Sequence, residues 1–196
     1  MALLDFSLQN DIAPTVECET VRLRQPRFSD YEQWHRLREE SREHLTRWEA
    51  DWAEEETTFA AYKERVKSYI RATKRGVGVP FFMFRQSDDT LIGGVNLINI
   101  IRGACQSASL GYWTGEQYTR CGYGQAGVQA IVDHGISTLG LNRIEAACQP
   151  DNLPSRALLE KLSFHQEGYA QEYLYINGAW RDHMIYAMTA RYWAKY

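Results

Sequence analysis

The sequence predicts a mixed α/β fold built around a largely antiparallel sheet. Apolar residues that alternate with polar ones predict strands near both ends of the chain and in its middle. Apolar residues at helical spacing predict several helices between these strands. Asn177-Gly178 separates the last two strand patterns, and this pair is typical of a tight hairpin turn because both turn residues need positive φ. A length of 196 residues suits a single domain.

The first part of the chain is predicted to hold one short strand followed by helices. Val21 and Leu23 alternate with arginines, which predicts a strand that ends at Pro26. Ser29-Asp30 is a suitable N-cap for the first helix. The apolar face of that helix consists of Tyr31, Trp34 and Leu37. The apolar face of the next helix consists of Phe59, Tyr62, Val66 and Ile70.

Strands dominate the rest of the chain, with two helices between them. The expected strands are 81–85, 91–100, 108–114, 144–148, 173–176 and 180–188. A helix between the third and fourth of these is predicted by the spacing of Val128, Ile131, Val132, Ile136 and Leu139. Pro154 suits the first turn of a second helix, which carries Leu158 and Leu162.

Composition and charge exclude several classes of protein. The 44% hydrophobic and 24% charged fractions are typical of globular proteins and argue against disorder and fibres. A net charge of −3 argues against a general nucleic-acid-binding surface, because such binding depends on Lys and Arg. No apolar stretch approaches about 18 residues, so no membrane-spanning helix is expected.

The cysteines and the N-terminus favour a cytoplasmic protein. The four cysteines (Cys18, Cys105, Cys121 and Cys148) include no C-x-x-C pair and no His cluster at metal spacing, so we expect reduced thiols and no metal. Residues 1–14 lack a basic segment before an apolar run, which makes them a poor signal peptide. We expect residues 1–17 to be a leader outside a domain over residues 18–190.

A glycine-rich turn joins the strand at 108–114 to the helix that follows it. Tyr118 to Gln125 reads Tyr-Thr-Arg-Cys-Gly-Tyr-Gly-Gln. Backbone N–H groups at a helix start bind phosphate, Gly122 and Gly124 permit close approach, and Arg120 adds a cation. The pattern is also typical of an ordinary turn, and it matches neither a Walker loop nor a dinucleotide fingerprint. From these residues alone, phosphate binding stays one of two interpretations.

An ordered series of motifs is more specific than this turn. The series consists of Gly111-Tyr112-Trp113, Tyr118-(x3)-Gly122-Tyr123-Gly124, Leu141-Asn142-Arg143-Ile144-Glu145-Ala146, Gln149-Pro150-x-Asn152-(x2)-Ser155 and Leu159-Glu160-Lys161-Leu162-x-Phe164. In this order the motifs resemble the acetyl-coenzyme A (acetyl-CoA) core of the GNAT superfamily of N-acetyltransferases. Further segments resemble its Rim-type branch, the ribosomal-protein alanine N-acetyltransferases (RimJ and RimL). These segments are His44 to Glu49, Asn99 to Gly103, Glu167 to Leu174 and Asn177 to His183.

The resemblance implies a fold, a co-substrate and roles for individual residues. It implies a six- to seven-stranded sheet that splays between its fourth and fifth strands, with helices on both faces, and acetyl-CoA as co-substrate without a metal. Backbone groups of Tyr112, Trp113 and Thr114 would pair with the pantetheine arm. The pyrophosphate loop would consist of Thr119, Arg120, Cys121, Gly122, Tyr123 and Gly124. Asn152 would bind the pantetheine or acetyl region, and Ser155 would lie near the sulfur and protonate the leaving thiolate.

Three positions depart from the family pattern. Thr119 stands where the family usually has Gln or Arg, and Arg120-Cys121-Gly122 stands where Gly-Lys-Gly is usual, which removes one flexible position. We expect this loop to bind the cofactor more weakly. Ser163 replaces the usual glycine after the second helix, and a left-handed conformation there would cost about 1 kcal/mol relative to Gly.

The general base is the least determined part of the mechanism. Acetyl transfer needs a neutral amine, so a carboxylate must accept a proton directly or through water. Glu49 and Glu172 are the candidates, and both are also consistent with ordinary surface carboxylates. Asp182 and His183 are not expected to form a dyad, because neighbours on a strand point to opposite faces.

Other candidate residues have simpler interpretations that stay open. Asn152 and Ser155 are also consistent with helix caps, and Cys121 with a thiol that takes no part in the reaction. Trp48, Trp52, Tyr173 and Tyr175 suit either the core or a groove lining.

The leading hypothesis is acetylation of a protein N-terminal α-amine by a monomer or homodimer that binds neither nucleic acid nor membrane. Two alternatives stay open. One is acetylation of a small amine such as a polyamine, an aminoglycoside or an amino acid. The other is a non-catalytic acyl-CoA-binding or interaction module, which the altered loop at Thr119, Arg120 and Cys121 suggests.

Overall fold

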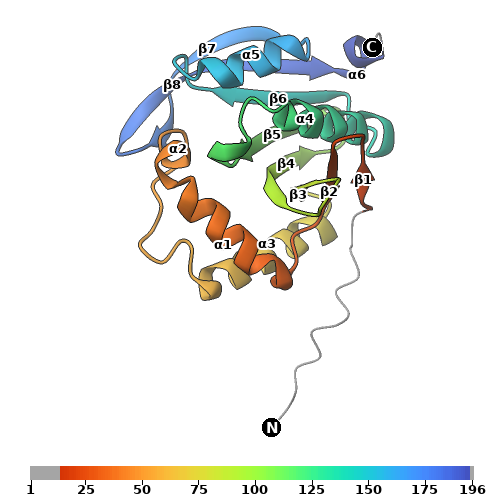
Figure 1. Cartoon of the computed structure of the whole chain (residues 1–196). Coiled ribbons are helices and arrows are strands. Elements are labelled where there is room, and N and C mark those ends of the chain that lie inside the picture. The colour runs from red at the N-terminus through yellow and green to blue at the C-terminus, as the bar shows by residue number, and fades with distance from the viewer. Residues whose placement is uncertain (1–13, 195–196) are drawn as a thin grey trace.

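A single open sheet forms the centre of the molecule in the computed structural model, which describes residues 14–194 (Figure 1). Its eight strands lie in the order β1-β2-β3-β4-β5-β6-β8-β7. Their bounds are β1 (Val16–Glu17), β2 (Val21–Arg24), β3 (Val79–Arg85), β4 (Leu91–Ile101), β5 (Ser107–Thr114), β6 (Arg143–Cys148), β7 (His165–Ile176) and β8 (Ala179–Thr189). The predicted mixed α/β fold is confirmed, with one strand more than expected: β1 lies inside the presumed leader and pairs with β2.

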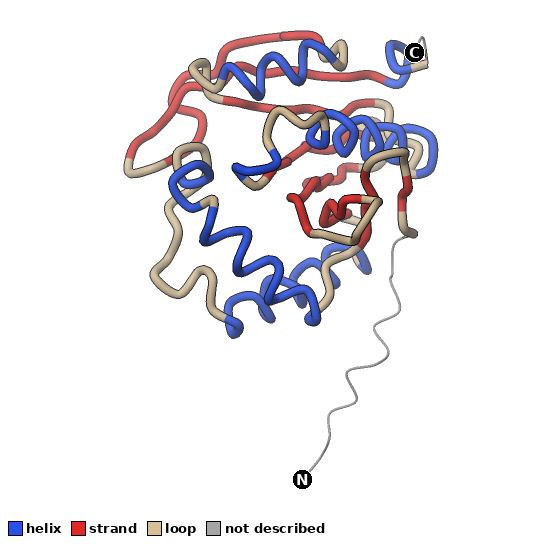
Figure 2. The backbone as a smooth tube through the Cα atoms, viewed as in Figure 1, coloured by secondary structure: helices blue, strands red, loops and turns tan. Residues whose placement is uncertain are grey.

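Six α-helices connect or flank these strands in the described part of the chain (Figure 2). Their bounds are α1 (Tyr31–Glu40), α2 (Arg42–Thr46), α3 (Phe59–Lys74), α4 (Tyr123–Asp133), α5 (Leu153–Lys161) and α6 (Ala190–Trp193). A π-helical turn over His134–Thr138 extends α4, so the predicted helix through Leu139 is present but starts at Tyr123. Within residues 14–194, no helix is long and apolar enough to cross a membrane.

Helices cover both faces of the sheet because β3 is apolar on both sides. Successive strand residues point to opposite faces. Phe81 and Met83 pack with α4 in one core, whereas Phe82 and Phe84 pack with α1 and α3 in a second core. Figure 1 shows α1 and α3 together, separated from α4 and α5 by the sheet strands.

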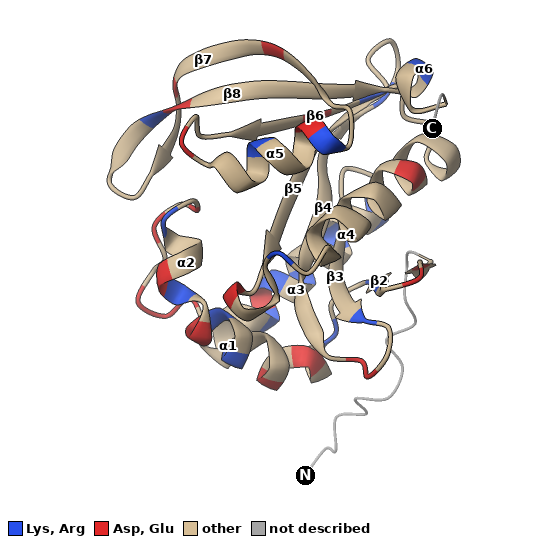
Figure 3. Cartoon of the chain, turned by 45° about the horizontal axis from the view of Figure 1, so that its top comes forward, with Lys and Arg blue, Asp and Glu red and all other residues tan. Residues whose placement is uncertain are grey.

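The sheet splays between β5 and β6, the fourth and fifth strands that the sequence predicts. These strands are parallel and pair only from Ser107 to Ser109 on β5 and from Arg143 to Glu145 on β6. Beyond Ser109, β5 continues to pair with β4 through Thr114. Figure 3 shows the two strands running apart toward α2 and the tip of the β7–β8 hairpin. The divergence leaves one edge of β5 without a strand partner.

The β7–β8 hairpin is longer than predicted and irregular. Asn177 and Gly178 have φ of 49° and 73°, as the Asn-Gly turn requires. β7 begins at His165 rather than at Tyr173, and its register with β8 shifts between Ala170 and Leu174. Beyond this bulge, the end of the hairpin curves toward α2 (Figure 1).

Candidate active site

A cavity of about 680 Å³ lies where β5 and β6 diverge. It is bounded by β5, the loop before α4, the end of β6, the start of α5, α2 and the β7–β8 hairpin. The predicted site residues that line it are Glu49, Tyr112, Trp113, Thr114, Thr119, Arg120, Gly122, Gly124, Asn152 and Ser155. The fold therefore brings ten candidate residues from separate segments to one place. Cys121, Tyr123 and Glu172 are not among the residues that line the cavity.

The glycine-rich turn forms the end of the cavity at the start of α4. Gly122 is the N-cap residue, with φ of 83°, a left-handed conformation that glycine adopts without strain. Arg120 also has a left-handed φ of 60°, which costs a non-glycine residue about 1–2 kcal/mol. The first N–H groups of α4 have no partner within the helix and point toward this end. Together with the Arg120 guanidinium they suit a pyrophosphate.

Gly124 lies at a close approach between α4 and the cavity wall. A Cβ at this position would lie 3.3 Å from Thr114 Oγ1 and 3.4 Å from Leu158 Cδ1. The Thr114 hydroxyl would have to move by a few tenths of an ångström, so glycine allows the close approach of α4 to β5 at this point. Thr119 Oγ1 donates to Glu116 O at 2.8 Å, which fixes the first residue of the turn.

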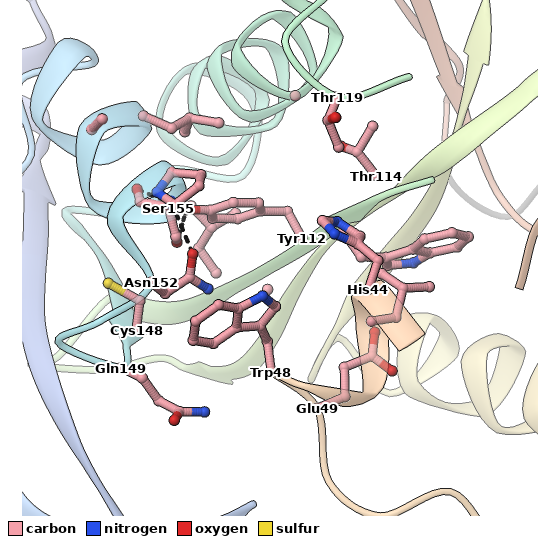
Figure 4. A pocket seen from close by; sticks show the side chains of 18 of the residues that line it. His44, Trp48, Glu49, Tyr112, Thr114, Thr119, Cys148, Gln149, Asn152 and Ser155 are labelled. Atoms are coloured by element: carbon pink, nitrogen blue, oxygen red, sulfur yellow. Dashed lines mark hydrogen bonds between the residues drawn. The ribbon is translucent and has the colours of Figure 1, made fainter. Parts of the chain in front are cut away.

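Asn152 and Ser155 hold the start of α5 against β5 (Figure 4). Asn152 is the helix N-cap, and its Oδ1 accepts a hydrogen bond from Ser155 N at 3.1 Å. Ser155 Oγ lies 2.6 Å from Tyr112 Oη. Burial raises the pKa of Tyr112, so its phenol stays protonated at neutral pH. Asn152 therefore has the cap role that the sequence left open, while Ser155 faces the cavity.

Cys148, the last residue of β6, was not among the residues singled out from the sequence for this site. It is buried in the cavity wall, where burial raises the pKa of its thiol. A hydrogen bond from the Ser155 hydroxyl acts in the opposite direction on that pKa. The Ser155 hydroxyl thus lies between a phenol and a thiol.

Glu49 lies in the cavity wall but is already engaged in an ion pair. Its two carboxylate oxygens accept hydrogen bonds from the Arg38 guanidinium at 2.9 and 2.6 Å, and Oε2 also accepts one from Trp52 Nε1 at 2.9 Å. The buried Arg38 guanidinium lies 4.0 Å from the ring centroid of Trp52 and 5.1 Å from that of Trp113. This cluster fastens the loop after α2 to α1 and β5.

Glu172 lies in the β7 bulge and is exposed. It has a left-handed φ of 47°, and its backbone N–H donates to Asp182 Oδ1 at 2.8 Å. Tyr169 and this N–H lower the pKa of Asp182. His183 is buried in the cavity wall, with Nδ1 3.0 Å from Arg181 O. Asp182 and His183 therefore lie on opposite faces of β8, as expected for adjacent strand residues.

Some residues that line the cavity were not assigned to it from the sequence. They include His44, Gln149, Leu174, Ile176 and His183, together with Trp48, which suited either the core or a groove lining. Gln149 Nε2 is buried and has no hydrogen-bond partner among residues 14–194. Gln149 and His183 both belong to the motifs quoted above, so their motif membership was the signal that could have identified them.

The charged residues of the cavity lining come from separate elements. Arg120 and Lys161 are basic, whereas Glu49 is acidic and is paired with Arg38. Figure 3 shows that α1, α2 and the loop that follows carry both acidic and basic positions. No group of three or more His, Cys, Asp or Glu side chains within residues 14–194 has the arrangement of a metal site.

Comparison with known proteins gives consistent matches over most of the chain. The family model of the acetyltransferase (GNAT) domain matches residues 20–165. The probable N-acetyltransferase YjcK of Bacillus subtilis is 35% identical over 170 residues, which cover 87% of this chain and 94% of that protein. The [ribosomal protein uS5]-alanine N-acetyltransferase of Escherichia coli is 32% identical over 183 residues, covering 92% and 94%. The structure of Mycobacterium smegmatis RimJ in complex with CoA-disulfide is similar with a TM-score of 0.87 and 31% identity, covering 91% of this chain and 88% of that one.

Proposed function

Because this chain belongs to the GNAT family of acetyltransferases, whose members use acetyl-CoA, we propose that it acetylates the N-terminal α-amine of a protein. The acceptor class is suggested by Rim-type relatives, one of which is named for the alanine of ribosomal protein uS5. The observation that carries the proposal is the cavity at the splay, which is lined by the start of α4 with Arg120 and by a wall that contains Glu49.

The cavity provides a complementary group for each part of acetyl-CoA. The start of α4 and Arg120 suit the pyrophosphate. The edge of β5 from Tyr112 to Thr114 has backbone groups free to pair with the amides of the pantetheine arm, as an added strand would. Asn152 and Ser155 lie beyond this edge, next to the place where the thioester would end.

Acetyl transfer then proceeds by direct attack of the amine. A neutral amine nitrogen forms a bond to the thioester carbon, and backbone N–H groups at the splay stabilise the resulting oxyanion. The carbon–sulfur bond breaks, its electron pair stays on sulfur, and the Ser155 hydroxyl gives that sulfur a proton. The attacking nitrogen loses one proton, so the overall proton count is balanced. No covalent enzyme intermediate is needed.

Glu49 is the better placed of the two candidate carboxylates. Its side chain is part of the cavity wall. The Glu49 carboxylate attracts the ammonium form of the acceptor amine and accepts a proton from that amine through water. The Arg38 ion pair holds Glu49 in position. Glu172, the other candidate, is exposed in the β7 bulge, and its side chain is not among those that line the cavity.

Thiol release in the presence of different amines tests this function. We expect acetyl-CoA to raise the melting temperature of the chain, because a ligand that binds only the native state stabilises it. We expect thiol release with peptides that begin with Ala or Ser and little release with polyamines. Release with small amines alone would favour the small-amine alternative. A thermal shift without release for any amine would favour a binding module.

A further inference from the structure

Tyr112 contributes a side chain to the site in addition to its backbone. Its Oη lies 2.6 Å from Ser155 Oγ and 3.4 Å from Ser155 O. Tyr112 comes from the middle of β5, and Ser155 comes from the first turn of α5. The two hydroxyls therefore meet across the splay, next to the position proposed for the thioester (Figure 4).

The chemistry of the two hydroxyls determines which one donates. A phenol is a stronger hydrogen-bond donor than an aliphatic alcohol, and burial keeps the Tyr112 phenol protonated by raising its pKa. When Tyr112 donates, Ser155 Oγ accepts and its own hydrogen must point elsewhere. The other polar neighbour of Ser155 Oγ is the Cys148 thiol in the cavity wall. The Ser155 hydrogen therefore points away from Tyr112, and an acceptor bound in the cavity beside Ser155 would compete for it with the Cys148 thiol.

We propose that Tyr112 is a positioning residue for acetyl transfer: its hydroxyl donates to Ser155 Oγ and directs the Ser155 hydrogen to the sulfur of the departing CoA. The inference rests on the proposed function, since it needs Ser155 to protonate that sulfur. The sequence assigned Tyr112 only a backbone contact with the pantetheine arm.

The protons balance in this step without ionisation of Tyr112. As the carbon–sulfur bond breaks, the electron pair stays on sulfur, and sulfur takes the Ser155 proton. Negative charge then develops on Ser155 Oγ, where the hydrogen bond from Tyr112 becomes stronger because its acceptor is charged. The proton lost by the attacking nitrogen returns to Ser155 through solvent. Tyr112 keeps its own proton throughout.

Substitution Tyr112→Phe tests this role, since it removes only the hydroxyl and keeps the buried ring. Loss of a hydrogen bond that strengthens with developing charge should lower kcat for an Ala peptide by about ten- to a hundredfold. KM for acetyl-CoA should stay within about twofold of wild type, because backbone contacts of β5 are kept. The matched control is Tyr175→Phe, an exposed tyrosine that does not line the cavity, and it should keep wild-type kcat.

A double-mutant cycle separates positioning from a structural effect. In a Ser155→Ala background there is no serine hydrogen to direct, so adding Tyr112→Phe should change kcat by less than about twofold. A structural defect would lower kcat in both backgrounds, and this comparison stays valid when Tyr112→Phe lowers stability. The acetyl-CoA-induced shift in melting temperature verifies cofactor binding in each variant.

The outcomes distinguish failure of the inference from failure of the proposed function. If Tyr112→Phe keeps the wild-type kcat, or lowers kcat equally in the wild-type and Ser155→Ala backgrounds, the role of Tyr112 is overturned. The proposed function is unaffected by either result. A wild-type chain that releases no thiol with any peptide would overturn the proposed function, and the role of Tyr112 with it.

Discussion

Arg120 and Ser163 adopt left-handed backbone at positions where the GNAT pattern usually has glycine, with φ of 60° at both. Ser163 closes α5: its N–H donates to Glu160 O at 2.9 Å, and Phe164 N–H donates to Leu159 O at 3.0 Å. This pair of hydrogen bonds is a Schellman motif, which requires a left-handed residue. Ser163 therefore adopts the left-handed conformation for which the sequence analysis expected a steric cost relative to glycine.

Replacing Ser163 with glycine should stabilise the chain. Glycine adopts the left-handed conformation without the steric cost, so Ser163→Gly should raise the free energy of unfolding by about 1 kcal/mol. Urea denaturation measures the change. The control is Ser68→Gly at an exposed position inside α3, where the same substitution should lower stability by about 0.5 kcal/mol. A loss of stability at position 163 would contradict the assignment.

Glu49 should contribute to both stability and acceptor binding. Glu49→Gln keeps the size of the side chain but removes the charge that compensates the buried Arg38. We expect the free energy of unfolding to fall by about 1–3 kcal/mol, the range for a hydrogen bond to a charged group. KM for the amine should rise more than KM for acetyl-CoA. An unchanged KM for the amine would restrict Glu49 to a structural role.

His134 should make stability depend on pH. It is buried beside Phe81, its Nε2 has no hydrogen-bond partner in the described part of the chain, and burial lowers its pKa from the ordinary value of 6.5. The unfolded chain therefore binds the proton more readily, and stability falls as pH drops below about 6.5. Urea denaturation at about pH 7.5 and at about pH 5.5 should show that the free energy of unfolding falls less for His134→Gln than for wild type. The exposed His165→Gln variant is the control and should lose as much stability between these pH values as wild type. The same pH dependence of stability in wild type and in both variants would contradict the role of His134.

The elements were predicted most accurately where one periodic pattern decides their structure. α4, α5 and the Asn177-Gly178 hairpin follow from spacing and turn chemistry. Residues 165–172 show no alternation of buried and exposed side chains, so this half of β7 is defined by its pairing with β8 rather than by local sequence. β1 likewise exists only because it pairs with β2.

The turn before α4 should be sensitive to a single methyl group. Gly122→Ala places a side chain on a residue with φ of 83°, although open space surrounds the new Cβ. The backbone must relax, which moves the N–H groups that suit the pyrophosphate, so KM for acetyl-CoA should rise by about tenfold with kcat kept. Gly168→Ala is the control, because a Cβ there also meets open space but without positive φ. Equal effects at both positions would contradict the assignment of the loop.

At the scale of the whole molecule, the splay between β5 and β6 creates the site. Cys148 and Gln149 reach the cavity from the end of β6, and His183 reaches it from within β8, two strands that pair only in the folded sheet. Their place therefore could not be derived from spacing along the chain, whereas the cofactor loop is contiguous and could be. The same holds for the pairing of Glu49 with Arg38, which joins residues from different elements across the cavity wall.

Selective acetylation of an N-terminal amine tests the central claim most directly. The chain is incubated with acetyl-CoA and an equal mixture of an Ala-starting peptide that contains lysine, the same peptide with its α-amine blocked, and a polyamine, and the products are identified by mass spectrometry. The account predicts one acetyl group on the α-amine of the free peptide, formed much more slowly by Ser155→Ala. Acetyl groups found only on lysine or the polyamine, or on no amine at all, would contradict it.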